Sequence, residues 1–126
     1  MSSRYAFIRR GVFAAAFAAL LAPGAASAHA MLHSSDPTDG ATLSASPRAL
    51  NLMFTEDCRV TALRLLDEGG REHQLRREGG RAASSRATAT VATPLPPGAY
   101  RLEWRAMGDD GHVMSGAVRF AVNASR

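Results

Sequence analysis

Cysteine is almost absent from this chain. Of its 126 residues only Cys58 carries a thiol, so no disulfide can form within the protein. Small exported domains often depend on disulfides. Here the hydrophobic core must hold the fold, helped by any ion that binds the native state. We expect Cys58 itself to be a small, buried apolar side chain.

Long apolar runs are also scarce. The longest covers residues 11–22, twelve residues in all, whereas a helix that crosses a bilayer needs about 20. Three arginines precede this run and Ala26-Ser27-Ala28 follows it, which is the three-part pattern of a secretory signal peptide. We therefore expect residues 1–28 to be cleaved after Ala28, leaving an exported domain of residues 29–126. A retained membrane anchor is the less favoured interpretation.

Lysine is missing altogether. All 15 basic residues are arginines, against 11 acidic residues, and three of the arginines fall in the signal peptide. The mature domain therefore has twelve arginines and a net charge of +1. These arginines alternate with acidic residues and do not form a block, so the basic isoelectric point of the whole chain does not predict a nucleic-acid partner.

A sustained apolar stripe of helical period is absent from the mature domain. Apolar and polar residues alternate instead, as in Tyr100, Leu102 and Trp104, which is typical of half-buried strands. Glycine-containing turn pairs separate these segments. With 98 residues, the pattern predicts an all-β, immunoglobulin-like antiparallel sandwich or barrel. Strands are expected at residues 50–54, 60–66, 86–93, 100–106 and 118–122, with a hairpin loop at 79–85.

His29 stands where cleavage would make it the first residue. A terminal histidine offers two metal ligands, its α-amine and its imidazole. The ordinary pKa of the amine is about 7.7–8, so a Lewis-acidic ion can displace its proton near neutral pH. The alternative is that His29 marks only where the domain begins, in a frayed terminus.

Asp110-Gly111-His112 is the second candidate. In an extended backbone, residues i and i+2 point to the same side, so Asp110 and His112 could face one metal. Asp-Gly is also an ordinary turn dipeptide, and a histidine after a turn needs no metal. Together with His29 the pair makes a donor set of three nitrogens and one oxygen, which favours Cu(II). Zinc remains an alternative, although it prefers tetrahedral sites.

Several short motifs occur in order along residues 29–126. They are His29-Ala30-Met31-Leu32 with Ser34-Ser35-Asp36-Pro37, then Phe54-Thr55-Glu56, then Pro97-Gly98-Ala99-Tyr100 with Trp104-Arg105, and finally Asp110-Gly111-His112 with Ser115-Gly116 and Phe120. Together they resemble the CopC family of periplasmic copper-binding, copper resistance proteins. Each piece is short, but their joint occurrence at compatible spacing is specific.

The resemblance implies a Greek-key β-sandwich or barrel that binds one Cu(II) ion. Its ligands would be His29, through amine and ring, Asp110 and His112. It also implies copper resistance, sequestration or delivery, with a CopD-like inner-membrane copper protein as partner. Met31 stands where some members have a further histidine. No methionine-rich loop is present between residues 50 and 91, so no separate Cu(I) site is expected.

Two other function classes remain as alternatives. A copper-dependent oxidase or monooxygenase can also use an amino-terminal histidine on a β-sandwich, although we expect a binding protein and not an enzyme. A metal-free immunoglobulin-like interaction domain is the third class. Several further side chains are not expected to be ligands: the thioethers of Met31, Met107 and Met114, with Met107 filling a gap in the core; a solvated His33; and His73 on the surface.

Overall fold

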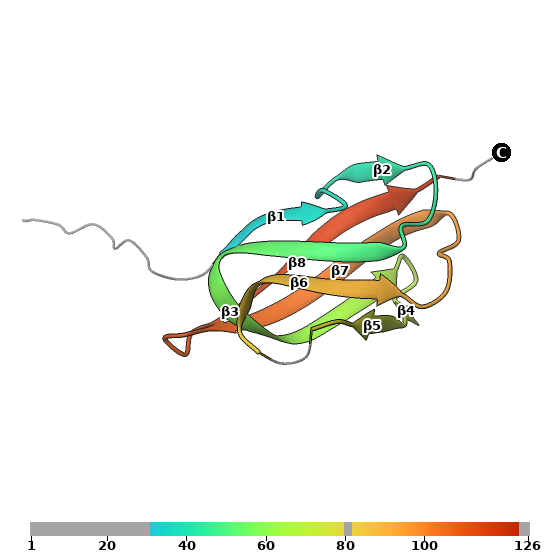
Figure 1. The fold of residues 1–126 in the computed structure, drawn as a ribbon. Helices are drawn as coiled ribbons and strands as arrows, with labels where there is room; N and C mark the ends of the chain where they lie inside the picture. The colour runs from blue at the N-terminus through green and yellow to red at the C-terminus, as the bar shows by residue number, and fades with distance from the viewer. Residues whose placement is uncertain (1–30, 80–81, 124–126) are drawn as a thin grey trace, which may run out of the picture.

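The described part of the chain, residues 31–79 and 82–123 of the computed structural model, is built from strands. In chain order they are β1 (Leu32–Asp36), β2 (Ala41–Leu43), β3 (Ala49–Asp67), β4 (Glu72–His73), β5 (Leu75–Arg77), β6 (Ser84–Val91), β7 (Gly98–Gly108) and β8 (Val113–Val122) (Figure 1). None of these described residues forms a helix long and apolar enough to cross a membrane. The predicted signal peptide and its cleavage point lie outside the described residues.

β3 is the strand that joins the two layers. Its first part pairs antiparallel with β1 and β6, and its second part, from Cys58 to Asp67, pairs with β7 and β4. The register against β6 shifts between Met53 and Cys58, where the strand bends from one layer into the other (Figure 1). The predicted strands at residues 50–54 and 60–66 are therefore two parts of one 19-residue strand.

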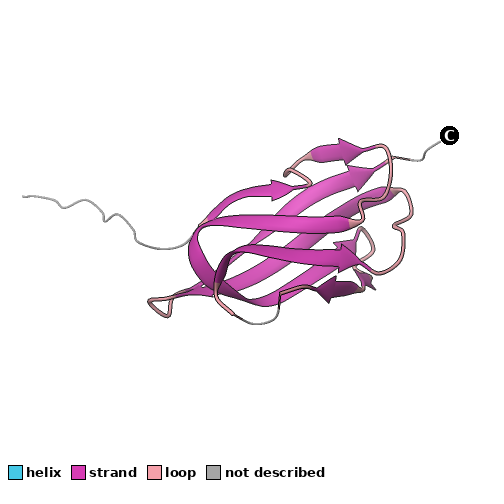
Figure 2. Ribbon diagram, viewed as in Figure 1, coloured by secondary structure: helices cyan, strands magenta, loops and turns pink. Residues whose placement is uncertain are grey.

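The sheet curls on itself because β3 belongs to both layers. Hydrogen bonding runs in the order β2-β8-β7-β3-β6-β5, with β1 and β4 added on β3. Figure 2 shows the curled sheet, with its strands in magenta and the connecting loops in pink. β2 lies parallel to β8, and the other pairs are antiparallel. β3 has β6 and β7 as neighbours, so strands distant in sequence pair as in Greek-key folds. The predicted all-β sandwich is confirmed.

The core lies between the layers and follows the predicted alternation. Tyr100, Leu102, Trp104 and Ala106 of β7 are buried. They lie beside the buried side chains of β8 and pack with those of the first part of β3 in one cluster. The Tyr100 and Phe120 rings stack with centroids 5.6 Å apart, whereas Phe54 meets Trp104 edge-on at 5.3 Å. Such aromatic pairs contribute about 0.5–1.5 kcal/mol beyond their burial. The core is thus continuous from one end of the sandwich to the other.

Cys58 is buried in this core, as predicted, with 2% of its surface exposed. Burial raises the pKa of its thiol, and the nearby Asp57 carboxylate raises it further. A thiol with a raised pKa is a poor nucleophile and a poor metal ligand, because both roles need the thiolate. Cys58 therefore acts as a packing residue.

Gly116 lies directly opposite Trp104 in the β7–β8 ladder. A Cβ at this position would lie 2.8 Å from Trp104 Cζ2 and 3.1 Å from its Nε1. The indole therefore covers the backbone of β8 where no side chain is present. Its N–H is buried without a hydrogen-bond partner in the described part of the chain. This close approach requires glycine.

Replacing Gly116 with alanine should lower the free energy of unfolding by about 1–3 kcal/mol, because a buried ring cannot move aside without disturbing the core. Chemical denaturation would measure it. Ser115→Ala, at the exposed neighbouring position, is the matched control and should change little. Equal stability of Gly116→Ala and the wild type would show that the indole has room to shift.

His73 is partly buried, with 20% of its side chain exposed, whereas the sequence-based expectation placed it on the surface. Its Nε2 lies 3.0 Å from Asp67 Oδ2, and its ring meets Tyr100 edge-on at 5.4 Å. Both partners come from outside its own strand, because β4 folds back on the end of β3. The hydrogen bond from His73 lowers the pKa of Asp67, helped by the backbone N–H groups of Arg71 and Gly69.

This carboxylate makes stability depend on acid pH. Since the folded-state pKa of Asp67 lies below its unfolded value of about 3.9, its contribution is complete above that value and is lost as pH falls through the folded pKa. Asp67→Asn should therefore lower Tm at pH 7, and the difference from wild type should narrow below about pH 4. Glu56→Gln removes an exposed carboxylate as control. A Tm difference between Asp67→Asn and the wild type that does not change with pH would contradict a lowered pKa of Asp67.

Candidate metal centre

The hairpin between β7 and β8 carries the two predicted ligands that the structure describes. The strands stay in register to the pair Met107 and Val113. The turn is then closed by two backbone hydrogen bonds, from Gly108 N–H to the His112 carbonyl and from Gly111 N–H to the Gly108 carbonyl, both 3.0 Å. Gly111 has φ +84°, in the left-handed region that glycine adopts without strain. The turn is therefore tightly defined.

Asp110 and His112 are in direct contact within this turn. Asp110 Oδ1 accepts a hydrogen bond from the His112 backbone N–H at 3.0 Å, and Asp110 Oδ2 lies 2.9 Å from His112 Nδ1. One carboxylate thus holds both the backbone and the ring of the histidine. When Nδ1 carries the proton, Nε2 keeps its lone pair. Carboxylates hold metal-binding histidines in this way, fixing the tautomer and orienting the ring.

The pair is accessible to a ligand from solvent. The His112 side chain is 67% exposed and that of Asp110 is 39% exposed. In the described residues no group of three or more histidine, cysteine, aspartate or glutamate side chains forms a complete metal site. A metal centre here with three such side chains would therefore need one of them from beyond those residues.

The bend of β3 brings the amino end of the domain to this hairpin. Met31 N–H donates to Thr55 Oγ1 at 2.9 Å, and Thr55 N–H donates to the Met31 carbonyl at 2.8 Å. Three residues further along β3, Cys58 is the register partner of Gly108, where the hairpin turn begins. Residues 55–58 therefore hold the entry to β1 and the base of the hairpin. Figure 1 shows both at the same end of the sandwich.

His29, the third predicted ligand, lies outside the described residues, so its place in the site stays a prediction. It lies two positions before Met31 in the sequence, and two consecutive Cα–Cα steps of an extended chain span about 7 Å at most. The hydrogen-bonded position of Met31 therefore limits how far from this end His29 can lie. His33, on β1, is exposed as expected.

The burial of one methionine differs from the prediction. Met107, expected to fill a core gap, is 36% exposed, because it continues the outward-facing phase of Arg101 and Arg105 along β7. Met31 is 59% exposed, whereas Met114 packs against the core. Among the described residues, the large apolar side chains that are exposed (Met31, Met107 and Val113) all lie at the hairpin end.

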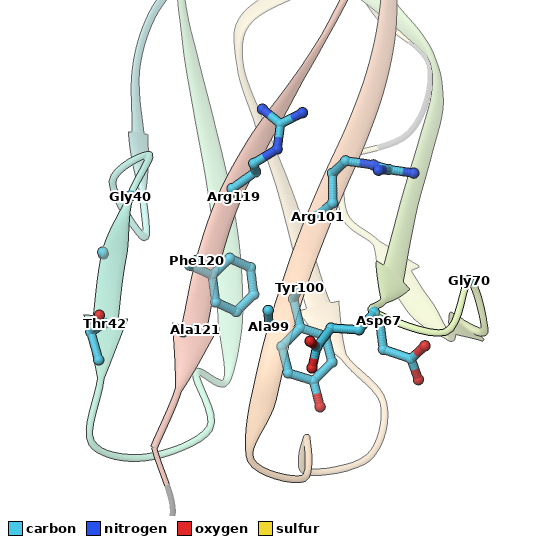
Figure 3. Close-up of a pocket in the computed structure, with 12 residues that line it drawn as sticks. Gly40, Thr42, Asp67, Gly70, Ala99, Tyr100, Arg101, Arg119, Phe120 and Ala121 are labelled. Carbon is cyan, nitrogen blue, oxygen red and sulfur yellow. The ribbon is translucent and has the colours of Figure 1, made fainter.

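A separate hollow of about 360 Å³ lies at the other end of β7 (Figure 3). Tyr100, Arg101 and Asp67 line it, near the first residues of β7, whereas the hairpin follows the last ones. Burial raises the pKa of the Tyr100 hydroxyl, and the carboxylates of Asp67 and Glu68 raise it further. No histidine or cysteine lines this hollow. The hairpin is therefore the better candidate for a metal centre.

The class of protein is therefore a small Greek-key β-sandwich that carries an aspartate-histidine pair on the hairpin beside its amino end. The model of the CopC domain matches residues 32–123. The chain belongs to the CopC family, as the sequence motifs predicted.

Two curated relatives support this membership. Copper resistance protein C of Xanthomonas campestris pv. juglandis is 36% identical over 113 residues, which cover 83% of this chain and 88% of that protein. Copper resistance protein C of Pseudomonas syringae pv. tomato is 32% identical over 124 residues, covering 91% and 98%.

Solved structures agree on the fold. CopC from Methylosinus trichosporium OB3b superposes with a TM-score of 0.68 at 22% identity, covering 78% of this chain and 97% of that one. PcoC, a methionine-rich copper resistance protein from Escherichia coli, gives 0.63 at 27% identity, covering 76% and 100%.

Removing the Asp110 carboxylate should release the His112 ring. We expect the neutral imidazole of the wild type to hold its proton on Nδ1, because Asp110 accepts it, and Asp110→Ala to shift the proton toward Nε2. Long-range ¹⁵N–¹H correlation spectra distinguish the two tautomers. Asp109→Ala, one residue earlier, is the control. A wild-type ring protonated on Nε2 would contradict the hydrogen bond as described.

Proposed function

We propose that this protein binds one Cu(II) ion in the periplasm, for copper resistance, by sequestering the ion or delivering it to a membrane protein. The observation that carries the proposal is the Asp110–His112 pair, held on a hairpin at the end where the chain enters β1. The choice of copper as the metal rests on family membership, since the curated relatives are named for copper resistance.

The ligands follow from the chemistry of the residues. His112 offers Nε2, since Asp110 holds Nδ1. His29 would supply its imidazole and, after cleavage behind Ala28, its α-amine. Asp110 orients the His112 ring before the ion binds. To serve as the fourth donor it would have to turn from Nδ1 to the ion, because Nδ1 and Nε2 lie on different sides of the ring. Three nitrogens and one oxygen suit a tetragonal Cu(II) ion.

Exposure of the pair suits an ion that is cargo. A site that must take up and release copper benefits from ligands open to solvent and to a receiving protein, and both side chains are accessible. The natural receiver is a CopD-like protein of the inner membrane, as the family resemblance implies.

A binding role is favoured over an oxidase. The aromatic residues of the described chain (Phe54, Tyr100, Trp104 and Phe120) are all buried in the core. A polysaccharide-oxidising enzyme needs a broad exposed face for its substrate, commonly with aromatic side chains. Asp110 would also occupy a coordination position on the copper ion that an oxidase needs for oxygen.

Blocking the amino terminus tests the site. A protein that retains Ala28 before His29 loses the free amine of the histidine, so its Cu(II) affinity should fall by roughly 100-fold or more, about 2.8 kcal/mol. The EPR spectrum should change at the same time. An alanine added after Arg126 is the matched control. Unchanged affinity and an unchanged spectrum would exclude His29 as an anchor.

The hairpin can be tested in the same titration. His112→Ala should weaken Cu(II) binding and abolish the rise of Tm that one equivalent of copper gives the wild type, because a ligand that binds only the native state stabilises it. His33→Ala, at the exposed position on β1, should keep the Cu(II) affinity of the wild type and the rise of Tm with copper. A wild-type Tm that does not respond to copper would favour a metal-free interaction domain.

A further inference from the structure

The outer face of β3, β7 and β8 contains a groove of about 690 Å³. It is lined by four arginines, a single acidic residue and the largely buried Trp104, with small residues between them. The charged residues are Arg64, Arg101, Arg105, Arg119 and Glu103, and the small ones are Ala62, Ser115, Gly116 and Ala117. A domain with a predicted net charge near zero thus concentrates positive charge on one face.

Half of this positive charge is not balanced within the described part of the chain. Glu103 contacts Arg101 at 2.8 Å and Arg64 at 3.9 Å. Arg105 and Arg119 have no carboxylate within ion-pair distance among the described residues; Asp39 contacts only the backbone N–H of Arg119. Two exposed guanidinium groups therefore remain available to an anion.

The ladder also places like charges side by side. Arg101 and Arg119 are register partners on β7 and β8, and both extend from neighbouring strands in Figure 3. Directly opposed like charges destabilise a sheet. A bound anion would relieve this repulsion, and the planar guanidinium group binds carboxylates in a bidentate manner.

We propose that this groove binds an extended, acidic segment of a partner protein. Alternate side chains of an extended chain point the same way about 7 Å apart, the spacing at which Arg101, Glu103 and Arg105 follow one another along β7. The small residues leave room for a backbone between the arginines. The groove also adjoins the hollow at the start of β7, since Arg101 and Arg119 line both.

A membrane surface fits this face less well. Interfacial anchoring uses exposed tryptophan and tyrosine side chains, and the aromatic residues of the described chain are buried. A hollow that follows the strands suits an inserted chain better than a flat layer of headgroups. The inference goes beyond the copper site and requires neither the metal nor the cleaved amino terminus.

NMR titration of the ¹⁵N-labelled protein with a synthetic peptide of alternating glutamate and threonine tests the proposal. Amide shifts should concentrate on β7 and β8 and weaken with salt. Arg105→Gln with Arg119→Gln should lower the affinity about tenfold. Glu103→Gln, which removes the only acidic residue of the groove, should raise it. A peptide with lysine in place of glutamate should not bind.

The matched control is Arg76→Gln with Arg86→Gln, which removes the same charge from exposed positions on β5 and β6 in the other layer. It should leave peptide affinity within about twofold of wild type after correction for salt. An equal loss of peptide affinity in both double variants would show that only the net charge of the protein matters, and would overturn the proposal. Binding of phosphatidylglycerol vesicles, but not of the peptide, through Arg105 and Arg119 would overturn it in favour of a membrane.

Discussion

The bend of β3 is the constraint on which the rest of this structure depends. Without an internal disulfide, the two layers are joined through one strand that pairs with β1 and β6 before the bend and with β7 and β4 after it. Residues 55–58 hold Met31 through Thr55 and meet Gly108 through Cys58. The same few residues therefore fix the sandwich and bring the amino end of the domain to the hairpin that carries Asp110 and His112.

β7 and β8 use each of their surfaces for a different purpose. Their inward side chains, such as Leu102 and Val118, build the core. Their outward side chains form the arginine groove, and the turn between them carries the proposed copper ligands. Because the phase of a strand fixes which way each residue points, one hairpin can serve all three purposes without conflict. Met107 and Val113 lie between groove and turn, so a segment docked in the groove would lie beside the metal ligands.

Alternation along the chain was enough to predict β7, β8 and the sandwich, because burial on one face leaves a period of two in the sequence. It did not show that β3 is one strand, because Glu56 and Asp57 interrupt the apolar pattern while the backbone continues. The partial burial of His73 was missed, because its partner Asp67 is brought to it by a turn. Met107 could have been placed outside by extending the phase of β7. For the site, spacing predicted that Asp110 and His112 belong together, but spacing does not determine that the carboxylate holds Nδ1.

The central claim is that cleavage and folding together create one copper site at the amino end of the domain. Native mass spectrometry of the protein recovered from the periplasm of copper-grown cells tests both parts in one measurement. The account predicts a chain that begins at His29 and retains one copper ion, which is lost when His112 is replaced by alanine. A chain that begins elsewhere and still binds one copper ion, with or without His112, would contradict it.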